Sequence, residues 1–229
     1  MSARRPVGWA VAGYGVTWLV VAGLVAVVVR LQTPNPAELL VDVADRPVVW
    51  LVMNVVLIAQ QLAMAEVVVA ACSVTDDDRW RRLIGTCGAI AAGSLIVSGV
   101  VHGVFGAHLA GRLDGRVPTP DEVRLAEVTH ALGDTTWFVG VGALMLLTAV
   151  TCERGWRSGR LSRSTVRLGA LGVIANAAQF GWFVDHRFAV FGAAGTVLQA
   201  GWLVALGRGV GRSGSNGGAG TRPAASSPS

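Results

Sequence analysis

The chain has 229 residues, of which 52% are hydrophobic and only 14% are charged, and its formal net charge is +5. An ordinary soluble domain carries roughly 25% charged residues, so this composition excludes most soluble enzymes and indicates a membrane protein. The positive charge does not predict nucleic-acid binding, because the arginines form no basic face on a soluble module.

Six apolar runs are long enough to cross the hydrocarbon core of a bilayer, which takes roughly 20 helical residues. The alternating pattern of membrane strands is absent from them, and helices satisfy every backbone polar group in lipid. We therefore predict an all-α polytopic membrane bundle in residues 1–207, followed by a disordered tail at 208–229. The six predicted transmembrane helices are 8–29, 48–74, 83–109, 131–152, 166–184 and 188–206.

Arginine supplies all the basic charge, and its distribution predicts the orientation. If all six runs cross the membrane, thirteen arginines lie on the side of the two chain ends and six lie on the other side. The positive-inside rule then predicts that both termini are cytoplasmic. The first run has no small-x-small cleavage site, so we expect a retained anchor rather than a signal peptide.

Two of the outer loops carry the signature of a helix start. Asn35 precedes a proline and stands three residues before a glutamate, which predicts a short helix on the outer membrane surface. Thr119 repeats the pattern with Pro120 and Glu122, and predicts one helix from about residue 119 to 152. Such a helix is about 50 Å long, so its first turns stand outside the membrane.

Small residues recur at every fourth position of the third run, at Gly99, Gly103, Ala107 and Gly111. Such a stripe lets another helix approach closely, and we expect it to be the packing centre of the bundle. The alternative is that the stripe docks a second copy of the chain or another membrane protein.

Ionisable side chains inside a membrane are costly, so each is a candidate functional residue. In the fourth run, Glu127, His130 and Asp134 share one helix face. We expect this face to point into protein, where His130 and Asp134 suit acid–base chemistry or proton transfer. The other polar residues on the outer half are Asn54, His102, His108, Asp185 and His186.

Metal binding is the more specific hypothesis for the polar residues on the outer half. His102, His130 and Asp134 supply three ligands, the number that an open zinc or iron site requires. No His-x-x-x-His or Cys-x-x-Cys spacing supports a metal site. We therefore predict no metal and favour histidines hydrogen-bonded to loops or water, with only His102 buried. No pattern in the sequence identifies a cofactor.

On the inner half, Glu66 follows two glutamines in the second run. A carboxylate at that depth must be protonated or paired, and we expect an arginine of the loop at 79–82 to pair with it. Amides in spans usually join helices by hydrogen bonds, and we favour that role over substrate contact. These amides are Asn54, Gln61, Asn176, Gln179 and Gln199.

The run Asp76, Asp77 and Asp78 resembles the magnesium-diphosphate motif of membrane enzymes that transfer prenyl groups. Such enzymes need a second aspartate cluster on the same side of the membrane, and this chain has none there. We therefore expect a solvated loop in which the three aspartates neutralise neighbouring arginines.

From residue 131 onward, the sequence resembles a group of six-helix bacterial membrane proteins. The resemblance lies in GDTTWFVGVGALMLLTAV, RSGRLSRSTVRLGALGVIANAAQ and GWLVALGRG, which give a glycine-rich span, a basic cytoplasmic turn and a closing helix. Ser162 stands in that turn where the group usually has proline. The resemblance implies the six-span fold and no particular activity. Heavy use of alanine, glycine, valine and arginine resembles an actinobacterial protein.

Two kinds of function fit these residues. The preferred hypothesis is a membrane protein that binds or moves a small or lipid-like molecule through a polar site in the outer leaflet. The alternative is a membrane-embedded enzyme acting on a lipid or isoprenoid, with Asp134 or Glu66 as proton donor and His130 or His102 as base. A closed pocket at Asp134 favours the enzyme, and a continuous polar path to Glu66 favours transport. The candidate binding residues are Asn54, Gln61, Asn176, Gln179 and Asp185.

Reporter fusions test the predicted orientation. A fluorescent protein that folds only in the cytoplasm should fluoresce at either chain end, and alkaline phosphatase should be active when inserted near residue 116. The arginine distribution predicts this result, because cytoplasmic loops retain most of the basic residues. Fluorescence at one end together with phosphatase activity at the other would contradict the predicted depths of all candidate residues.

Overall fold

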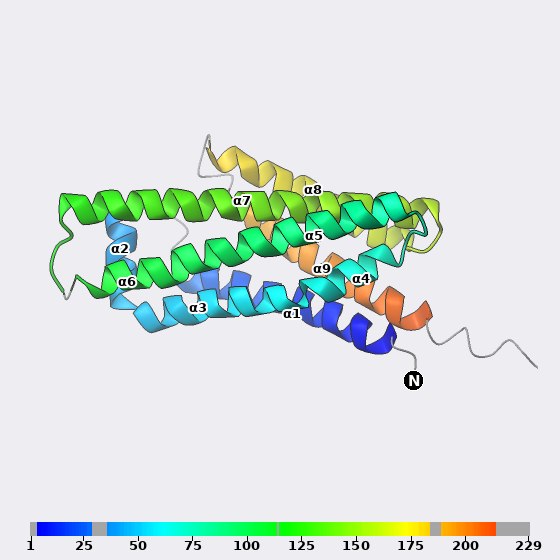
Figure 1. Cartoon of the computed structure of the whole chain (residues 1–229), viewed down its shortest axis with the longest axis horizontal. Coiled ribbons are helices and arrows are strands. Elements are labelled where there is room, and N and C mark those ends of the chain that lie inside the picture. Colours follow the sequence, from blue (N-terminus) through cyan, green and yellow to red (C-terminus); the bar gives the residue numbers. More distant parts are fainter. Residues whose placement is uncertain (1–3, 29–35, 114, 184–188, 214–229) are drawn as a thin grey trace, which may run out of the picture.

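The computed structural model describes residues 4–28, 36–113, 115–183 and 189–213. In these residues every regular element is a helix (Figure 1), so the predicted all-α class is confirmed. The α-helices are α1 (Arg4–Val28), α2 (Pro36–Asp45), α3 (Pro47–Gln60), α4 (Met64–Cys72), α5 (Asp78–Gly99), α6 (Gly106–Gly111), α7 (Pro120–Arg157), α8 (Arg163–Gln179) and α9 (Ala189–Ser213). Short turns of other pitch join some of them: η1 (Gln61–Ala63), η2 (Val100–Phe105) and η3 (Phe180–Phe183).

Three helical stretches of the described residues are long and apolar enough to cross a membrane. They are Pro47–Cys72, Asp78–Gly111 and Pro120–Arg157, and they match the second, third and fourth predicted spans. A membrane location is therefore compatible with the structure. The other three apolar runs are helical too, as α1, α8 and α9.

The end of α9 differs from the prediction. The predicted disordered tail begins at residue 208, whereas α9 continues through Ser213. Val210 packs against the main core, which gives this last part of the helix an apolar partner. Residues 214–229 lie outside the described part of the chain.

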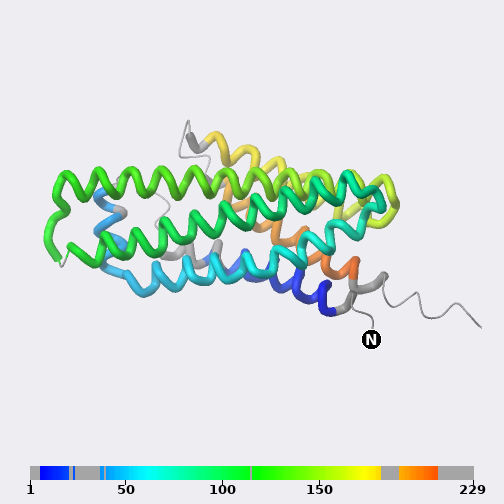
Figure 2. The backbone as a smooth tube through the Cα atoms, viewed as in Figure 1, coloured from blue at the N-terminus to red at the C-terminus, as the bar shows by residue number. Residues whose placement is uncertain are grey.

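The helices lie side by side in an elongated bundle (Figure 1). α1 packs on α9, α9 packs on α8, and α5 runs antiparallel to α7. The backbone trace in Figure 2 places the start of α1, the α4–α5 loop, the α7–α8 turn and the end of α9 at one end of the bundle, which we call the terminal end. The opposite end holds α2 and the α6–α7 connection, and we call it the α2 end.

The main core lies between α1, α4, α5, α7 and α9. Its largest fully buried side chains include Tyr14, Leu95, Leu147 and Trp202. Trp18 of α1 meets Trp137 of α7 edge to face, with ring centroids 5.7 Å apart.

The predicted start of α7 is confirmed at the level of hydrogen bonds. The hydroxyl of Thr119 accepts from the backbone N–H of Glu122 at 3.4 Å, and the Glu122 carboxylate accepts from the backbone N–H of Thr119 at 2.9 Å. Each group satisfies a donor that the helix start would otherwise leave unpaired. With 38 residues, α7 is about 57 Å long, well beyond a hydrocarbon core of about 30 Å.

The contact expected for the apolar edge of the short helix is wrong. α2 exists and begins at Pro36 as predicted, although Asn35 itself lies outside the described residues. Leu40 and Val43 do not face lipid, because they are buried against Leu109 of α6 and neighbouring residues of the same small core. α2 therefore closes one end of the bundle instead of lying apart on a surface.

The small-residue stripe is filled from within the chain. A Cβ atom added at Gly99 would meet Ile58 of α3 at 2.8 Å, and one added at Gly103 would meet Asn54 of α3 at 2.4 Å. The prediction of a packing centre is confirmed for these two residues, whereas Gly111 has open space around it. Because α3 already covers half of the stripe, docking of a partner through the whole stripe is excluded.

The contact between α1 and α9 yields a stability prediction. A side chain at Gly15 would meet the Ala200 carbonyl oxygen at 2.8 Å, so Gly15→Val should destabilise the protein by about 1–3 kcal/mol through overpacking. Thermal unfolding in detergent, followed by circular dichroism, measures the change. Gly13→Val is the matched control, since the added carbon meets nothing within 4 Å. Equal unfolding temperatures for the two variants would contradict the α1–α9 packing.

Candidate functional site

Three of the predicted residues converge at one point. His102 Nε2 lies 3.4 Å from Asp134 Oδ1, and His130 Nε2 lies 3.3 Å from Asp134 Oδ2. The two imidazole rings have centroids 5.2 Å apart. One nitrogen or oxygen from each of the three side chains lies within 4.8 Å of the other two. We call these three residues the His–Asp cluster.

Two neighbouring helical segments supply the cluster. His130 and Asp134 are four residues apart on α7, so they share a face as the sequence predicted. His102 comes from η2, a six-residue π-helical segment between α5 and α6. Such wider turns break the regular helical register and re-aim side chains, often at functional sites. The indole Nε1–H of Trp50 donates to the backbone oxygen of His102 at 2.7 Å and ties η2 to α3.

A glycine allows the imidazole of His102 to lie against α7. A Cβ atom at Gly133 would lie 2.4 Å from His102 Nε2, closer than any real contact permits. Any other residue at this position would therefore displace the ring or separate the two helices. Because Asp134 directly follows Gly133, the same approach brings the ring to the carboxylate.

Ser98 determines which nitrogen of His102 carries a proton. The Ser98 hydroxyl is fully buried and donates its single hydrogen to the Gly133 carbonyl oxygen at 2.9 Å. Its oxygen lies 3.4 Å from His102 Nδ1 and must then accept, which assigns the hydrogen of a neutral imidazole to Nδ1. The lone pair of His102 Nε2 is left towards Asp134. Among the described residues this buried nitrogen has no hydrogen-bond partner.

A recess adjoins the two histidines. Its volume is about 40 Å³, enough for two or three water molecules. Most of its wall is apolar, and the imidazoles of the cluster stand at one side. The lining residues are Leu40, Val43, Trp50, His102, Gly106, Leu109, Ala126, Thr129 and His130.

The surroundings of His130 differ from the sequence-based interpretation, which favoured hydrogen bonds from the histidines to loops or water. His130 contacts Asp134 and His102 rather than a loop, and its side chain is 36% exposed against 18% for His102. His108 lies outside the cluster, and so does Glu127, which is exposed. Asp185 and His186 lie outside the described residues.

The predicted amides lie in three separate places. Asn54 is buried beside the cluster, where its Nδ2 donates to the Trp50 carbonyl at 2.9 Å. Gln61 lies farther away and accepts a hydrogen bond from the Tyr14 hydroxyl at 3.0 Å, which joins α1 to the α3–α4 stretch. Gln61 therefore acts as the predicted link between helices.

Asn176 and Gln179 border a separate recess with a volume of about 20 Å³. Asn176 Nδ2 donates to the Gly172 carbonyl at 3.0 Å within α8, and Gln199 Nε2 donates to the Thr148 hydroxyl at 2.7 Å across helices. This second recess lies between α1, α7, α8 and α9 and does not include the His–Asp cluster.

Glu66 stands apart from both recesses. Its side chain is half-buried on α4, and no hydrogen bond or ion pair of this carboxylate is found with the described residues. The predicted pairing with the loop at 79–82 is wrong for Arg81, whose guanidinium instead lies 3.5 Å from Asp76 and 3.6 Å from Asp78. Neither of the two recesses leads from the His–Asp cluster to Glu66.

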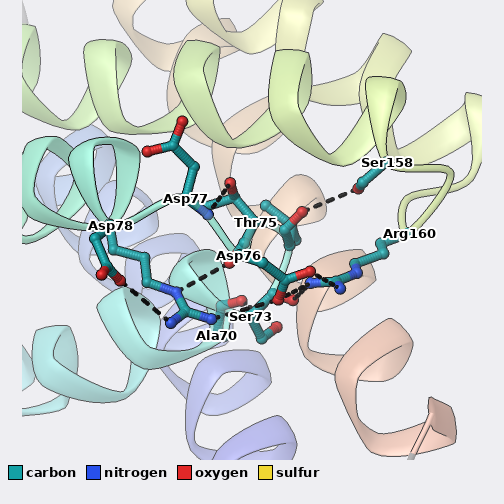
Figure 3. Close-up of polar contacts among 10 residues, drawn as sticks. Ala70, Ser73, Thr75, Asp76, Asp77, Asp78, Ser158 and Arg160 are labelled. Atoms are coloured by element: carbon teal, nitrogen blue, oxygen red, sulfur yellow. Dashed lines mark hydrogen bonds and ion pairs between the residues drawn. The ribbon is translucent and has the colours of Figure 1, made fainter.

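The aspartate run is confirmed as a loop neutralised by arginines (Figure 3). Asp76 pairs with Arg160 of the α7–α8 turn, and Asp77 caps α5 by accepting from the backbone N–H of Arg79 at 2.9 Å. Arg160 also donates to the Ser73 carbonyl at 2.8 Å, so the two connections at the terminal end are tied together. The hydrogen bond from Arg160 lowers the pKa of the Asp76 carboxyl, and the charge of Arg81 adds to this effect.

Sequence reasoning did not identify Ser98, Trp50 or Gly133, which position the cluster. The available signal for Ser98 was its place four residues before His102, where the two share a helix face.

Comparisons with protein-family models, curated proteins and solved structures find no match to this chain.

The charge network at the terminal end predicts a pH dependence. Because the pKa of Asp76 is lowered in the folded state, its pairing stabilises the protein above the unfolded pKa of about 3.9 and is lost as pH falls through the folded value. The unfolding temperature of Asp76→Asn should lie below that of the wild type at pH 7, and the difference should shrink below about pH 4. Thermal unfolding between pH 7 and pH 3 measures it.

The control for this series is Asp42→Asn, a carboxylate on α2 for which the described residues supply no ion pair. Its unfolding temperature should follow that of the wild type at every pH. A difference for Asp76→Asn that stays constant down to pH 3 would contradict the pairing with Arg160.

Proposed function

We propose that this chain is a multi-pass protein of the bacterial cytoplasmic membrane that binds the polar head group of a lipid-like molecule at the His–Asp cluster. In the proposed topology the three span-length helices cross the membrane together with α1, α8 and α9, which pack along them. The start of α1 and the end of α9 lie at the terminal end of the bundle together with the arginine-rich loops. This arrangement supports a cytoplasmic placement of that end. The α2 end then faces outward.

The observation that carries this proposal is the mixed chemistry of the recess under α2. Leu40, Val43 and Leu109 give it an apolar wall, while the imidazoles of His102 and His130 give it a polar side. A site of this kind suits a molecule that has both a polar group and an apolar part. Its volume of about 40 Å³ fits part of a head group and leaves acyl chains in the membrane.

Binding is favoured over permeation, because neither recess of the described residues forms a continuous polar path to Glu66. An enzyme is the second candidate, since Asp134 lies within 3.4 Å of two imidazoles and proton exchange between them is short-range. The enzyme hypothesis, however, called for a closed pocket of a few hundred Å³ that contains Asp134. Asp134 is not part of the recess lining.

Filling the recess tests lipid binding. Ala126→Trp places an indole in the recess, and should lower the retention of phospholipid on the order of tenfold, equivalent to about 1.4 kcal/mol of lost binding energy. The protein is released from nanodiscs of phosphatidylethanolamine and phosphatidylglycerol, and native mass spectrometry counts the phospholipids that stay bound. Retention by Ala126→Trp equal to the wild type would refute the proposal.

Leu125→Trp is the matched control. It adds the same indole to the adjacent position of α7, where the side chain is 50% exposed and outside the recess. Phospholipid retention should therefore equal that of the wild type. A comparable loss in both variants would show that the added indole acts on the bundle as a whole and would also contradict a site at Ala126.

A further inference from the structure

We infer that the His–Asp cluster is a divalent transition-metal site, for which Zn²⁺ is the best-fitting ion. The inference deepens the proposed function and rests on it only for placing the cluster on the outer side of the membrane. It concerns an ion held by the three side chains, whereas the lipid proposal concerns a head group in the recess that His102 and His130 line.

Two hydrogen-bond acceptors face each other in the His–Asp cluster. Ser98 assigns the hydrogen of a neutral His102 imidazole to Nδ1, so in that form Nε2 presents a lone pair to the Asp134 carboxylate at 3.4 Å. No hydrogen bond with a described residue satisfies this buried nitrogen, and the same is true of His130 Nδ1. An unpaired buried acceptor is costly, and a lone pair facing a carboxylate adds repulsion. A cation between the two atoms removes both costs.

The distances suit a small ion with few ligands. Zinc binds imidazole nitrogen at about 2.0–2.1 Å and carboxylate oxygen at about 2.0–2.2 Å, so tetrahedral ligand atoms lie about 3.3–3.5 Å from one another. His102 Nε2 lies 3.4 Å from Asp134 Oδ1 and His130 Nε2 lies 3.3 Å from Asp134 Oδ2, so each imidazole meets a different oxygen of the carboxylate. One ligand atom from each of the three side chains lies within 4.8 Å of the other two.

The net charge of the cluster and the hydrogen bond between Ser98 and His102 also favour a divalent cation. Two neutral imidazoles and one carboxylate give the site a charge of −1, and no arginine pairs with Asp134 in the part of the chain that the structure describes. Ser98 accepts from His102 Nδ1, as a supporting residue does in many metal sites by fixing the ring orientation. Imidazole together with carboxylate is a ligand set for zinc, whereas magnesium and calcium prefer oxygen alone.

Three protein ligands leave a fourth position open. His102 and His130 both reach the recess under α2, so this position faces the recess. Water or a phosphate oxygen of a head group is the chemically suited fourth ligand, because both are oxygen donors and the loaded site carries a net positive charge. The ion would thereby explain how a cluster with a carboxylate attracts an anionic head group.

Metal titration tests the inference without lipid. The full chain, purified in detergent and treated with a chelator, is titrated with Co²⁺ and separately with Zn²⁺. We expect one ion per chain by elemental analysis, and visible Co²⁺ bands of a four- or five-coordinate nitrogen and oxygen site. The chain has three cysteines, so a thiolate-to-cobalt charge-transfer band would indicate the wrong site and overturn the inference.

Variants identify the ligands. His102→Ala and Asp134→Ala should each weaken Co²⁺ binding at least about 100-fold, and Ser98→Ala should weaken it about 10-fold, in the range found for supporting residues. His108→Ala is the matched control, because it removes a histidine that lies outside the cluster. Equal affinity in His108→Ala and His102→Ala would overturn the inference. If a ligand variant does not fold, the wild-type stoichiometry and Co²⁺ spectrum decide alone.

Ala126→Trp separates the two proposals. It fills the recess that the fourth position faces and leaves all three protein ligands in place, so this variant should still bind one Co²⁺ per chain, with altered visible bands, while losing phospholipid. Metal binding without phospholipid binding in the wild type would refute only the lipid proposal. Phospholipid binding by a wild type that takes up no metal would refute only the metal site.

Discussion

The close approach of η2 to α7 is the contact on which the candidate site depends. Gly133 lets the imidazole of His102 lie directly on the α7 backbone, and the Ser98 hydroxyl bonds to the Gly133 carbonyl at the same place. Asp134 is the next residue along α7, so the helix geometry that seats the ring also places the carboxylate beside it. One interhelical contact therefore sets the position, the tautomer and the charge partner of His102.

α3 and α2 extend this contact to the end of the bundle. Trp50 holds the backbone of η2 through its indole N–H, and Asn54 packs against Gly103 one residue after His102. Leu40 of α2 then covers the same region from outside and forms one wall of the recess. Trp50 packs against the small core that contains Leu40 of α2 and donates to the His102 carbonyl, so one side chain links α2 to η2.

Helix starts and the spacing of residues on one helix follow from local rules, and the sequence predicted them. Contacts between helices depend on how the helices are aligned, and the sequence did not predict that alignment. The start of α7 followed from Thr119 and Glu122, and the pairing of His130 with Asp134 followed from helical spacing. The sequence named His102 beside His130 and Asp134 only as an alternative ligand set, because their meeting depends on the π-helical turn of η2 and on the register of α5 along α7, which no periodicity reports. α2 was misplaced because an amphipathic helix has the same apolar edge towards lipid or protein.

The two charged regions of the chain differ in how fully their carboxylates are paired by charged groups of the described residues. At the terminal end the carboxylates of Asp76 and Asp78 pair with Arg160 and Arg81 of the same chain. At the α2 end, the charged partners that the described residues give Asp134 are two imidazoles, one of which directs a lone pair towards it. No arginine of the described residues pairs with Asp134, so a protonated imidazole or a bound cation would supply the compensating charge.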